Sequence, residues 1–296
     1  LLLLDKPAGM TSNRALQIVR RLLNARKAGH TGSLDPAATG MLPLCFGEAT
    51  KVCAFLLNAD KSYRVVARLG VATDSGDADG EQTGTATVPD LSAEDWDAIL
   101  QSFVGESLQV PPMYSALKKD GKRLYELARK GETVEREPRP INVHDIQLME
   151  IAGTRLVFRV SCSKGTYVRT LVEDIARRAG TVAHTARLHR ETVGDFQADN
   201  MLDMGAVEAL AEQGVAVLAE HLLAPDIALQ GLPAVRLDEP AGESFRSGQS
   251  VRATEHVVPG LVRVYGAGEG FLGVGEADGS GQVAPRRVFH SPEKVS

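Results

Sequence analysis

The chain has 296 residues, which is enough for two domains or one large one. Its 43% hydrophobic and 24% charged residues are typical of a globular protein and exclude a disordered or fibrous chain. The net charge of −5 argues against indiscriminate nucleic-acid binding, but the charges are segregated along the chain, so local basic surfaces are still expected.

The sequence favours a protein without a membrane segment, a metal site or a disulfide framework. The leucine run 1–4 is too short for a signal peptide or a membrane span. Cys45, Cys53 and Cys162 form no CxxC pair and have no histidine at metal-ligand spacing. We therefore expect a reducing compartment, the cytoplasm. Because the chain begins with Leu, we also expect a few native residues to precede it.

A strand and a helix are the first predicted elements. Residues 1–5 form an apolar run typical of a buried strand. Thr11-Ser12-Asn13 provide a helix N-cap, and apolar residues then recur at helical spacing up to Leu23. From Lys6 to Leu34 the chain carries six cations and no acid, so this region is purely basic.

The segment 30–40, His-Thr-Gly-Ser-Leu-Asp-Pro-Ala-Ala-Thr-Gly, places Asp35 among small and turn-forming residues. Asp35 directly follows the basic region and has no other acid near it in the sequence. A lone carboxylate that faces cations stays ionised and can act as a nucleophile, and basic surroundings suit a phosphate-bearing partner. The alternative is that Asp35-Pro36 simply opens a turn.

The next predicted elements are a strand and a second helix. Residues 62–70 alternate, with Tyr63 and apolar residues on one face and Arg64 and Arg68 on the other. Ser92 to Asp95 match a capping box, which begins a helix. Residues 74–106 contain nine acids and no Lys or Arg, and a solvated surface is the simplest interpretation of this zone.

Residues 109–142 differ in character from the rest of the chain. They are rich in Pro, Lys, Arg and Glu, with Tyr114 and Tyr125 interleaved, and residues 111–140 hold eight cations and five acids. We interpret this stretch as an excursion from the core that is partly helical near residues 124–129.

The following predicted elements complete a mixed architecture. Residues 155–163 alternate as a strand, and a helix then stops at Gly180. Because Tyr167 and Arg169 are two residues apart, an extended backbone would place both on one face. Residues 204–223 predict one Ala-rich helix, and the chain beyond Pro225 predicts a small β domain. Strands and helices without βαβ regularity indicate an α+β fold.

Two patterns imitate cofactor or metal sites. Residues 268–273 match GxGxxG, but an acid lies inside the loop and no amphipathic helix follows, which argues against dinucleotide binding. His184 and His189 are five residues apart, which is not the spacing of a helical metal pair, so we expect structural or RNA-facing roles. We accordingly expect no cofactor and no metal.

Six segments, in this order, closely resemble the TruB family of tRNA pseudouridine synthases. They are LLLDKPAGMTS (2–12), KAGHTGSLDPAATG (27–40), GEATK (47–51), KSYR (61–64), VPPMYSALKKDGKRLYELARKG (110–131) and SKGTYVRTLVEDI (163–175). The resemblance implies a catalytic domain over residues 1–230 with a mixed, mainly antiparallel sheet and an RNA-binding insertion at 109–142. The tail, 232–296, resembles the PUA RNA-binding domain.

The resemblance implies isomerisation of the uridine at position 55 in the tRNA T loop to pseudouridine, without a cofactor. The family's nucleophilic Asp matches Asp35, which attacks the ribose anomeric carbon, abstracts a ribose proton or adds to the uracil ring. Arg169 matches the arginine that pairs with this Asp and opposes the pKa rise that desolvation causes. Tyr63 matches the catalytic tyrosine that stacks on the target base and can handle a proton, although a core aromatic is the alternative.

The resemblance also implies residues that bind the flipped-out nucleotide or the RNA backbone. Extruding a stacked uridine costs a few kcal/mol, and a histidine fills the vacated space in this family. Other residues that match family positions surround the base or lie near the active-site loop. Lysines of the insertion offer positive charges to RNA phosphates. The expected substrate-binding residues are His30, Tyr167, Leu188, Lys6, Lys118 and Lys119.

The expected partner is the T-stem loop of tRNA, bound by a monomer that needs no protein partner. Within the same class, the alternative is a guide-RNA-dependent synthase of the dyskerin kind, but the long insertion favours a stand-alone enzyme. A non-catalytic chaperone that helps tRNA to fold is an alternative of another class, and an enzyme could combine both roles. A third alternative, an RNA-binding module with an inactive site, conflicts with the presence of Asp35, Tyr63 and Arg169 together.

Overall fold

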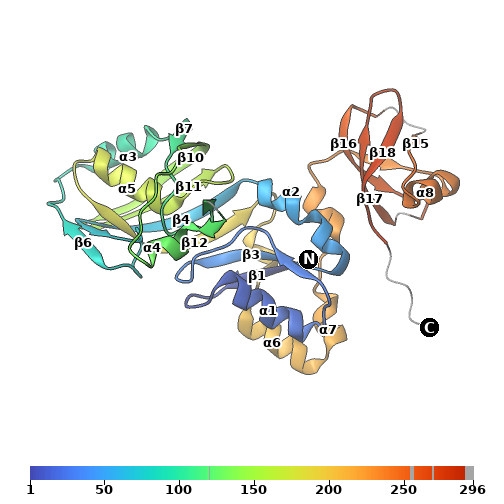
Figure 1. Cartoon of the computed structure of the whole chain (residues 1–296), viewed down its shortest axis with the longest axis horizontal. Coiled ribbons are helices and arrows are strands. Elements are labelled where there is room, and N and C mark those ends of the chain that lie inside the picture. Colours follow the sequence, from blue (N-terminus) through green and yellow to red (C-terminus); the bar gives the residue numbers. More distant parts are fainter. Residues whose placement is uncertain (120, 254–256, 269, 291–296) are drawn as a thin grey trace.

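The computed structural model describes residues 1–119, 121–253, 257–268 and 270–290. The chain forms a large body around one long sheet and a smaller C-terminal sheet to one side of it (Figure 1). This confirms the predicted α+β class with a mixed sheet and a C-terminal β domain.

The strands are β1 (Leu2–Lys6), β2 (Ala28–His30), β3 (Thr39–Phe46), β4 (Lys61–Leu69), β5 (Val71–Thr73), β6 (Gln82–Thr85), β7 (Gly105–Gln109), β8 (Lys118–Lys119), β9 (Lys122–Arg123), β10 (Arg139–Ala152), β11 (Arg155–Cys162), β12 (Ala183–Val193), β13 (Leu202–Asp203), β14 (Ala234–Arg236), β15 (Val251–Arg252), β16 (Gly260–Tyr265), β17 (Phe271–Ala277) and β18 (Gln282–Val288). The α-helices are α1 (Ser12–Leu22), α2 (Cys53–Asn58), α3 (Ala93–Gln101), α4 (Leu124–Ala128), α5 (Val168–Arg178), α6 (Met204–Gln213), α7 (Val215–Glu220) and α8 (Glu239–Arg246). The 3-10 helices are η1 (Gly47–Val52), η2 (Ala198–Asn200) and η3 (Pro225–Leu229).

The main sheet is mixed and mainly antiparallel, as predicted. Within the described residues its strands run in the order β13-β1-β3-β12-β4-β11-β10-β7, and β2 pairs with β3 beside this row. β1 is parallel to β13 and β12 is parallel to β3, while the other neighbours are antiparallel. This order places the loop that precedes β3, which carries Asp35, next to β12 and β4.

Two groups of helices cover the sheet (Figure 1). α3 and α5 pack on β4, β10, β11 and β12 around a core that includes Trp96, Phe158 and Ile175. α1, α6 and α7 pack on β1 and β3, where Leu2 and Leu4 are buried. Burial of each such side chain stabilises the fold by about 1.5–3 kcal/mol. The packed sheet therefore holds the polar groups at its centre in fixed positions.

Local sequence signals placed several element boundaries correctly. Thr11 caps α1, with its side chain accepting a hydrogen bond from the backbone N of Arg14 at 3.1 Å. Ser92 and Asp95 form the reciprocal capping box that begins α3. Gly180, whose φ is +81°, ends α5 as predicted, because glycine enters the left-handed region without a Cβ penalty.

The prediction of one helix over residues 204–223 is wrong. α6 ends at Gln213, Gly214 adopts a φ of +132°, and α7 follows in a new direction. The run of alanines continues across Gly214, so the composition hid the break. The prediction of strands alone beyond Pro225 also missed α8, which Asp238 caps by accepting from the backbone N of Ala241 at 2.9 Å.

The C-terminal sheet, in the order β14-β16-β17-β18-β15, contacts the body at η1. Lys51 Nζ donates to the carbonyl of Val288 at 2.7 Å, and the backbone N of His290 donates to Glu48 Oε2 at 3.0 Å. Phe289 joins an apolar cluster of the body. Residue 269 of the GxGxxG match lies outside the described residues, and the match ends in β17, a strand, rather than in the helix of a dinucleotide site. The domain division near residue 231 stays a prediction.

The excursion from the core is narrower than the predicted 109–142. It comprises residues 110–138, because Gln109 ends β7 and Arg139 begins β10, and both strands belong to the main sheet. It contains the β8–β9 hairpin and α4, the short helix that the sequence predicted.

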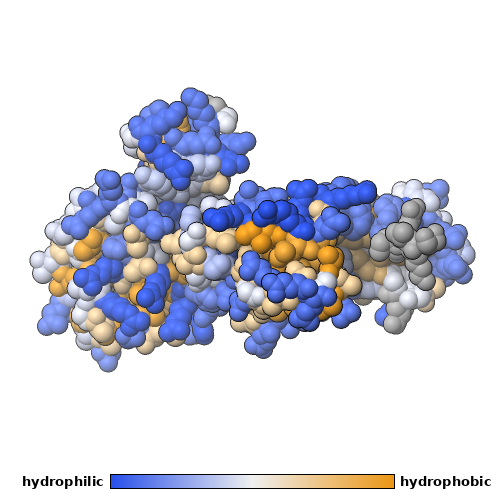
Figure 2. Space-filling view, turned by 90° about the horizontal axis from the view of Figure 1, so that it is seen from below, coloured by the Kyte–Doolittle hydropathy of each residue, from blue (hydrophilic) through white to orange (hydrophobic). Residues whose placement is uncertain are grey.

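Most of the surface seen from below is hydrophilic. Figure 2 shows one apolar band in the middle of the molecule, where Figure 1 places α6 and α7. Val215 at the start of α7 is 48% exposed. Across the described ranges, no helix is both long and apolar enough to cross a bilayer.

Candidate active site

The Asp35 loop, residues 31–38, is anchored from two sides. Ser12 Oγ accepts from the backbone N of Leu34 at 2.8 Å and donates to its carbonyl at 3.1 Å. The carbonyl of Pro36 accepts from the backbone N of Gly9 at 2.9 Å and from Lys6 Nζ at 3.3 Å. The predicted turn also forms, since the backbone N of Ala38 donates to the Asp35 carbonyl at 3.1 Å. The start of α1 and the end of β1 therefore fix the backbone of Asp35.

Arg169 binds the Asp35 carboxylate with two nitrogen atoms. Its Nε lies 3.0 Å from Oδ2, and its Nη2 donates to Oδ1 at 3.3 Å. The side chain of Arg169 is 6% exposed, whereas that of Asp35 is 40% exposed. A two-pronged, charge-assisted contact orients both oxygen atoms. The carboxylate is thus held from within the protein and remains open to a substrate.

Arg169 also joins the Asp35 loop to two other segments. Its Nη1 donates to the Ser75 carbonyl at 2.7 Å and lies 3.5 Å from Asp77 Oδ2. Its Nη2 donates to the carbonyl of Tyr114, in the excursion, at 2.7 Å. One buried guanidinium therefore joins the Asp35 loop, the acidic zone and the excursion.

The prediction that Asp35 is a lone carboxylate among cations is wrong. Burial raises the pKa of Asp35 above its ordinary value, Asp77 and Asp79 raise it further, and Arg169 and Lys6 lower it. Asp77 is only 15% exposed and shares Arg169 with Asp35. We missed Asp77 because it lies in the acidic zone that we interpreted as solvated surface. Its segment Thr-Asp-Ser-Gly-Asp-Ala-Asp-Gly has the same small, turn-forming character as the segment around Asp35, which was the available signal.

Tyr63 and Leu188 face the same side of the sheet as α5. Tyr63 is 8% exposed on β4, opposite Arg190 of β12. Burial raises the pKa of the Tyr63 phenol, while the charge of Arg190 opposes that rise. Leu188 is partly buried against the cluster that contains Leu34 and Tyr63. The structure thus brings Asp35, Arg169, Tyr63 and Leu188 into one region.

Tyr167 also lies near Asp35, but not for the reason we expected. α5 begins at Val168, so the backbone is not extended through Arg169. Gln109, which the sequence did not single out, holds Tyr167 by accepting from its backbone N at 2.8 Å and donating to its carbonyl at 3.1 Å. Burial raises the pKa of the Tyr167 phenol. The charge of Arg169 lowers this pKa and the charge of Asp35 raises it, which places Tyr167 near both groups.

Lys6 and His30 flank the Asp35 loop. Lys6 is fully buried, and its Nζ donates to the carbonyls of Pro7 at 2.8 Å and Met10 at 2.7 Å as well as to Pro36. Burial lowers the pKa of Lys6 to about 8. Burial, followed by the charge of Arg190, also lowers the pKa of His30, which favours a neutral imidazole. The buried Nδ1 of His30 has no hydrogen-bond partner in the described structure.

Lys118 and Lys119 lie apart from this centre, on the exposed β8–β9 hairpin. Lys119 Nζ donates to the carbonyl of Glu135 at 2.8 Å. His184 and His189 have structural partners, the carbonyl of Val71 at 2.9 Å and Thr39 Oγ1 at 2.8 Å. Among the residues that the structure describes, no cluster of His, Cys, Asp and Glu could hold a metal ion, and the three cysteines are free thiols.

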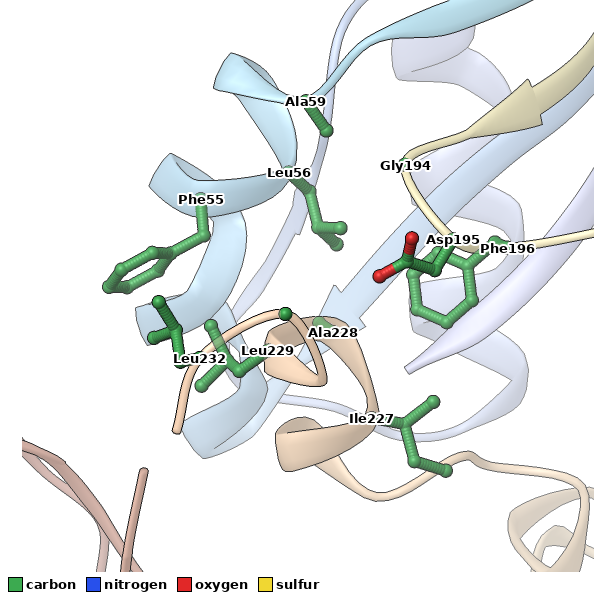
Figure 3. A pocket seen from close by; sticks show the side chains of 11 residues that line it. Phe55, Leu56, Ala59, Gly194, Asp195, Phe196, Ile227, Ala228, Leu229 and Leu232 are labelled. Atoms are coloured by element: carbon green, nitrogen blue, oxygen red, sulfur yellow. The ribbon is translucent and has the colours of Figure 1, made fainter. Parts of the chain in front are cut away.

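An apolar cavity of about 290 Å³ lies elsewhere, between α2, the end of β12 and η3 (Figure 3). Phe55, Phe196 and Ile227 line it, and Asp195 is the one charged residue in its lining. A specific ligand site needs several polar groups that converge on the ligand. The cavity lacks them and the Asp35 region has them, so the Asp35 region is the candidate active site.

Comparisons with known sequences identify the family of this chain. Models of the TruB family pseudouridylate synthase N-terminal domain, the tRNA pseudouridylate synthase B C-terminal domain and the pseudouridine synthase II TruB C-terminal region match residues 20–168, 169–230 and 233–289. Curated proteins named tRNA pseudouridine synthase B from Nitrosococcus oceani and Dechloromonas aromatica are both 50% identical to this chain. They cover 98% and 97% of it, and the match spans 94% of each relative.

Structural comparisons give the same fold. A chain of a Cbf5-Nop10-Gar1 complex superposes with a TM-score of 0.72 at 25% identity, over 93% of this chain and 77% of its own length. A chain of an H/ACA RNP bound to a substrate RNA containing 2′-deoxyuridine superposes with a TM-score of 0.76 at 22% identity, over 99% and 85%. With the family models and the 50% identical relatives, these findings show that the chain belongs to the TruB family of pseudouridylate synthases.

Proposed function

We propose that this protein isomerises the uridine at position 55 of the tRNA T loop to pseudouridine, with Asp35 as the nucleophile. The observation that carries the proposal is the two-pronged contact of buried Arg169 with the open Asp35 carboxylate. The relatives named tRNA pseudouridine synthase B support tRNA as the substrate. The 25% identical chain of the Cbf5-Nop10-Gar1 complex is weaker support for the alternative, an enzyme that works with protein partners.

The reaction is an isomerisation without net oxidation or reduction, and it needs no cofactor. The bond from N1 to C1′ breaks, a bond from C5 to C1′ forms, C5 loses its proton and N1 gains one. Attack on C1′, abstraction of a ribose proton and addition to the uracil ring all require Asp35 in its ionised form. Arg169 keeps that form accessible, because its charge opposes the pKa rise that burial causes.

The groups around Asp35 suit a flipped-out base. Tyr63 offers an aromatic face and Leu188 an apolar one, which together accommodate a uracil ring. A neutral His30 ring can fill the space left in the T loop. Tyr167, beside Asp35, is a further contact for the nucleotide.

A different part of the molecule binds the RNA backbone. Lys118 and Lys119 are exposed lysines of the excursion. The carbonyl of Tyr114, in the same excursion, accepts a hydrogen bond from Arg169. The segment that contacts RNA is therefore joined directly to the active centre. The C-terminal sheet adds a second RNA contact in this proposal. The protein acts as a monomer on the T-stem loop, without a metal or an obligatory protein partner.

Mapping pseudouridine in an unmodified tRNA transcript, with no cofactor added, tests the proposal. We expect modification at position 55 alone, and none in a matched transcript with cytidine at that position. Modification at another position, or tight tRNA binding without modification, would contradict the proposed function and favour a guide-dependent enzyme or a folding chaperone.

A further inference from the structure

Arg190 is a buried cation with no role in the mechanism above. It lies on β12, its residue is 1% exposed, and no carboxylate in the described part of the chain forms an ion pair with it. Burying an unpaired charge is costly, so such a group is retained only where its hydrogen bonds or its field compensate. Arg190 therefore calls for an explanation from its contacts.

The guanidinium of Arg190 holds the backbone on both sides of Asp35, within the Asp35 loop and in β3. Its Nη2 donates to the carbonyl of Gly32 at 3.1 Å, before Asp35, and its Nε donates to the carbonyl of Met41 at 2.6 Å, after Asp35. The backbones of Gly40 and Arg190 also pack directly against each other, because a Cβ added to Gly40 would lie 2.2 Å from the carbonyl oxygen of Arg190. Glycine is needed there, at a φ of +99°.

The side chain of Arg190 also lies beside that of Tyr63. Arg190 and Tyr63 are direct neighbours in the antiparallel register of β12 and β4, so their side chains share a face of the sheet. The charge of Arg190 also lowers the pKa of the Tyr63 phenol, so the two side chains interact electrostatically. Only an arginine offers a planar fork of donors that can serve acceptors in different directions, and a lysine at this position would keep the charge but lose the fork.

We propose that Arg190 is a positioning residue that fixes the Tyr63 hydroxyl relative to the Asp35 loop through one guanidinium. This inference rests on the proposed function of Asp35 and Tyr63. A misplacement of about 1 Å at a reacting group costs about 100-fold in rate, so the loss of such a clamp should slow the reaction without loosening the RNA.

A double-mutant cycle tests the inference. Single-turnover pseudouridine formation would be measured for wild type, Arg190→Gln, Tyr63→Phe and the double variant, with tRNA affinity and thermal unfolding measured on each. We expect Arg190→Gln to lower the rate about 100-fold in wild type and less than about 10-fold in the Tyr63→Phe background, because the two residues act together. Arg190→Lys should recover part of the loss, and tRNA affinity should change less than about threefold.

Arg187→Gln is the matched control, since Arg187 lies on the same strand but is exposed on the opposite face. It should leave the rate unchanged. Equal rate losses in both backgrounds, or a loss that follows tRNA affinity or thermal unfolding, would overturn the inference. If wild type forms pseudouridine but Arg190→Gln does so equally well, the inference alone fails; if wild type forms none, the proposed function fails.

Discussion

The centre around Asp35 and the β8–β9 hairpin are both charged, yet they hold their charges in opposite ways. Arg169 and Lys6 are buried, and each donates to several oxygen atoms. Lys118 and Lys119 are exposed on β8, a strand of only two residues. A buried, fully bonded cation fixes one atom for chemistry, whereas an exposed lysine adapts to phosphates along a polyanion. Burial and the number of partners, rather than charge, separate the two uses.

Removing the guanidinium of Arg169 should have the largest effect on the buried centre. We expect Arg169→Gln to lower the single-turnover rate by about 1000-fold, because Asp35 loses its oriented partner and faces Asp77 directly. Arg169→Lys keeps the charge but not the two-pronged geometry, and should lose about 100-fold. Both variants should bind tRNA nearly as wild type does. Full activity of Arg169→Gln would contradict a centre organised by Arg169.

The buried Lys6 should make stability depend on pH in a defined direction. Its pKa is lowered from 10.5 to about 8 in the folded protein, so the unfolded chain binds more protons between these values. The contribution of Lys6 to the free energy of unfolding therefore rises with pH in this window, by up to ~3 kcal/mol.

Denaturant unfolding of wild type and Lys6→Met at pH 7.5 and pH 10 measures this contribution. The rise with pH should be smaller in Lys6→Met than in wild type. Lys122→Met, which removes an exposed lysine of the hairpin, should behave as wild type does. Identical pH dependence in wild type and Lys6→Met would show that Lys6 is not held as a buried cation.

Asp77→Asn should shift the pH dependence of the rate in the direction opposite to Arg169→Gln. Asp77 raises the pKa of Asp35 and Arg169 lowers it. An ionised Asp35 is lost as pH falls, so the acid limb of the rate should move to lower pH in Asp77→Asn and to higher pH in Arg169→Gln. We also expect about a tenfold loss at neutral pH in Asp77→Asn, from weaker positioning of Arg169. Single-turnover rates across pH 4 to pH 8 measure both effects, and limbs that move in the same direction would refute the shared-arginine arrangement.

Neutralising the hairpin should have the smallest effect, and on binding rather than chemistry. We expect Lys118→Gln and Lys119→Gln each to weaken tRNA binding a few-fold and to reduce the salt dependence of affinity by about one charge. Arg64→Gln, on the exposed face of β4, is the control and should leave the salt slope unchanged. An unchanged slope in the lysine variants would remove them from the RNA contacts.

Much of the scaffold could be predicted because its signals are local. The alternation around Tyr63, the N-cap Thr11 and the box Ser92–Asp95 each act within a few residues. The break at Gly214 could not be found this way, since the alanine pattern continues across it. Helix α8 was missed because short apolar runs and glycines dominate the C-terminal region.

Only part of the candidate site could be predicted from the sequence. The family resemblance named Asp35 and Arg169, and the structure pairs them. Asp77 and Arg190 escaped notice, because their roles depend on strands and loops that meet only in three dimensions. The face shared by Tyr167 and Arg169 was wrongly inferred, since α5 begins between them.

The most direct test compares wild type with Asp35→Asn on the same tRNA transcript, with pseudouridine mapped to the nucleotide and tRNA affinity measured in parallel. We expect wild type to modify position 55 and Asp35→Asn to form no detectable product while binding tRNA with similar affinity. Any help that the protein gives to tRNA folding should persist in Asp35→Asn. Pseudouridine formed by Asp35→Asn at the wild-type rate would contradict Asp35 as the reactive group.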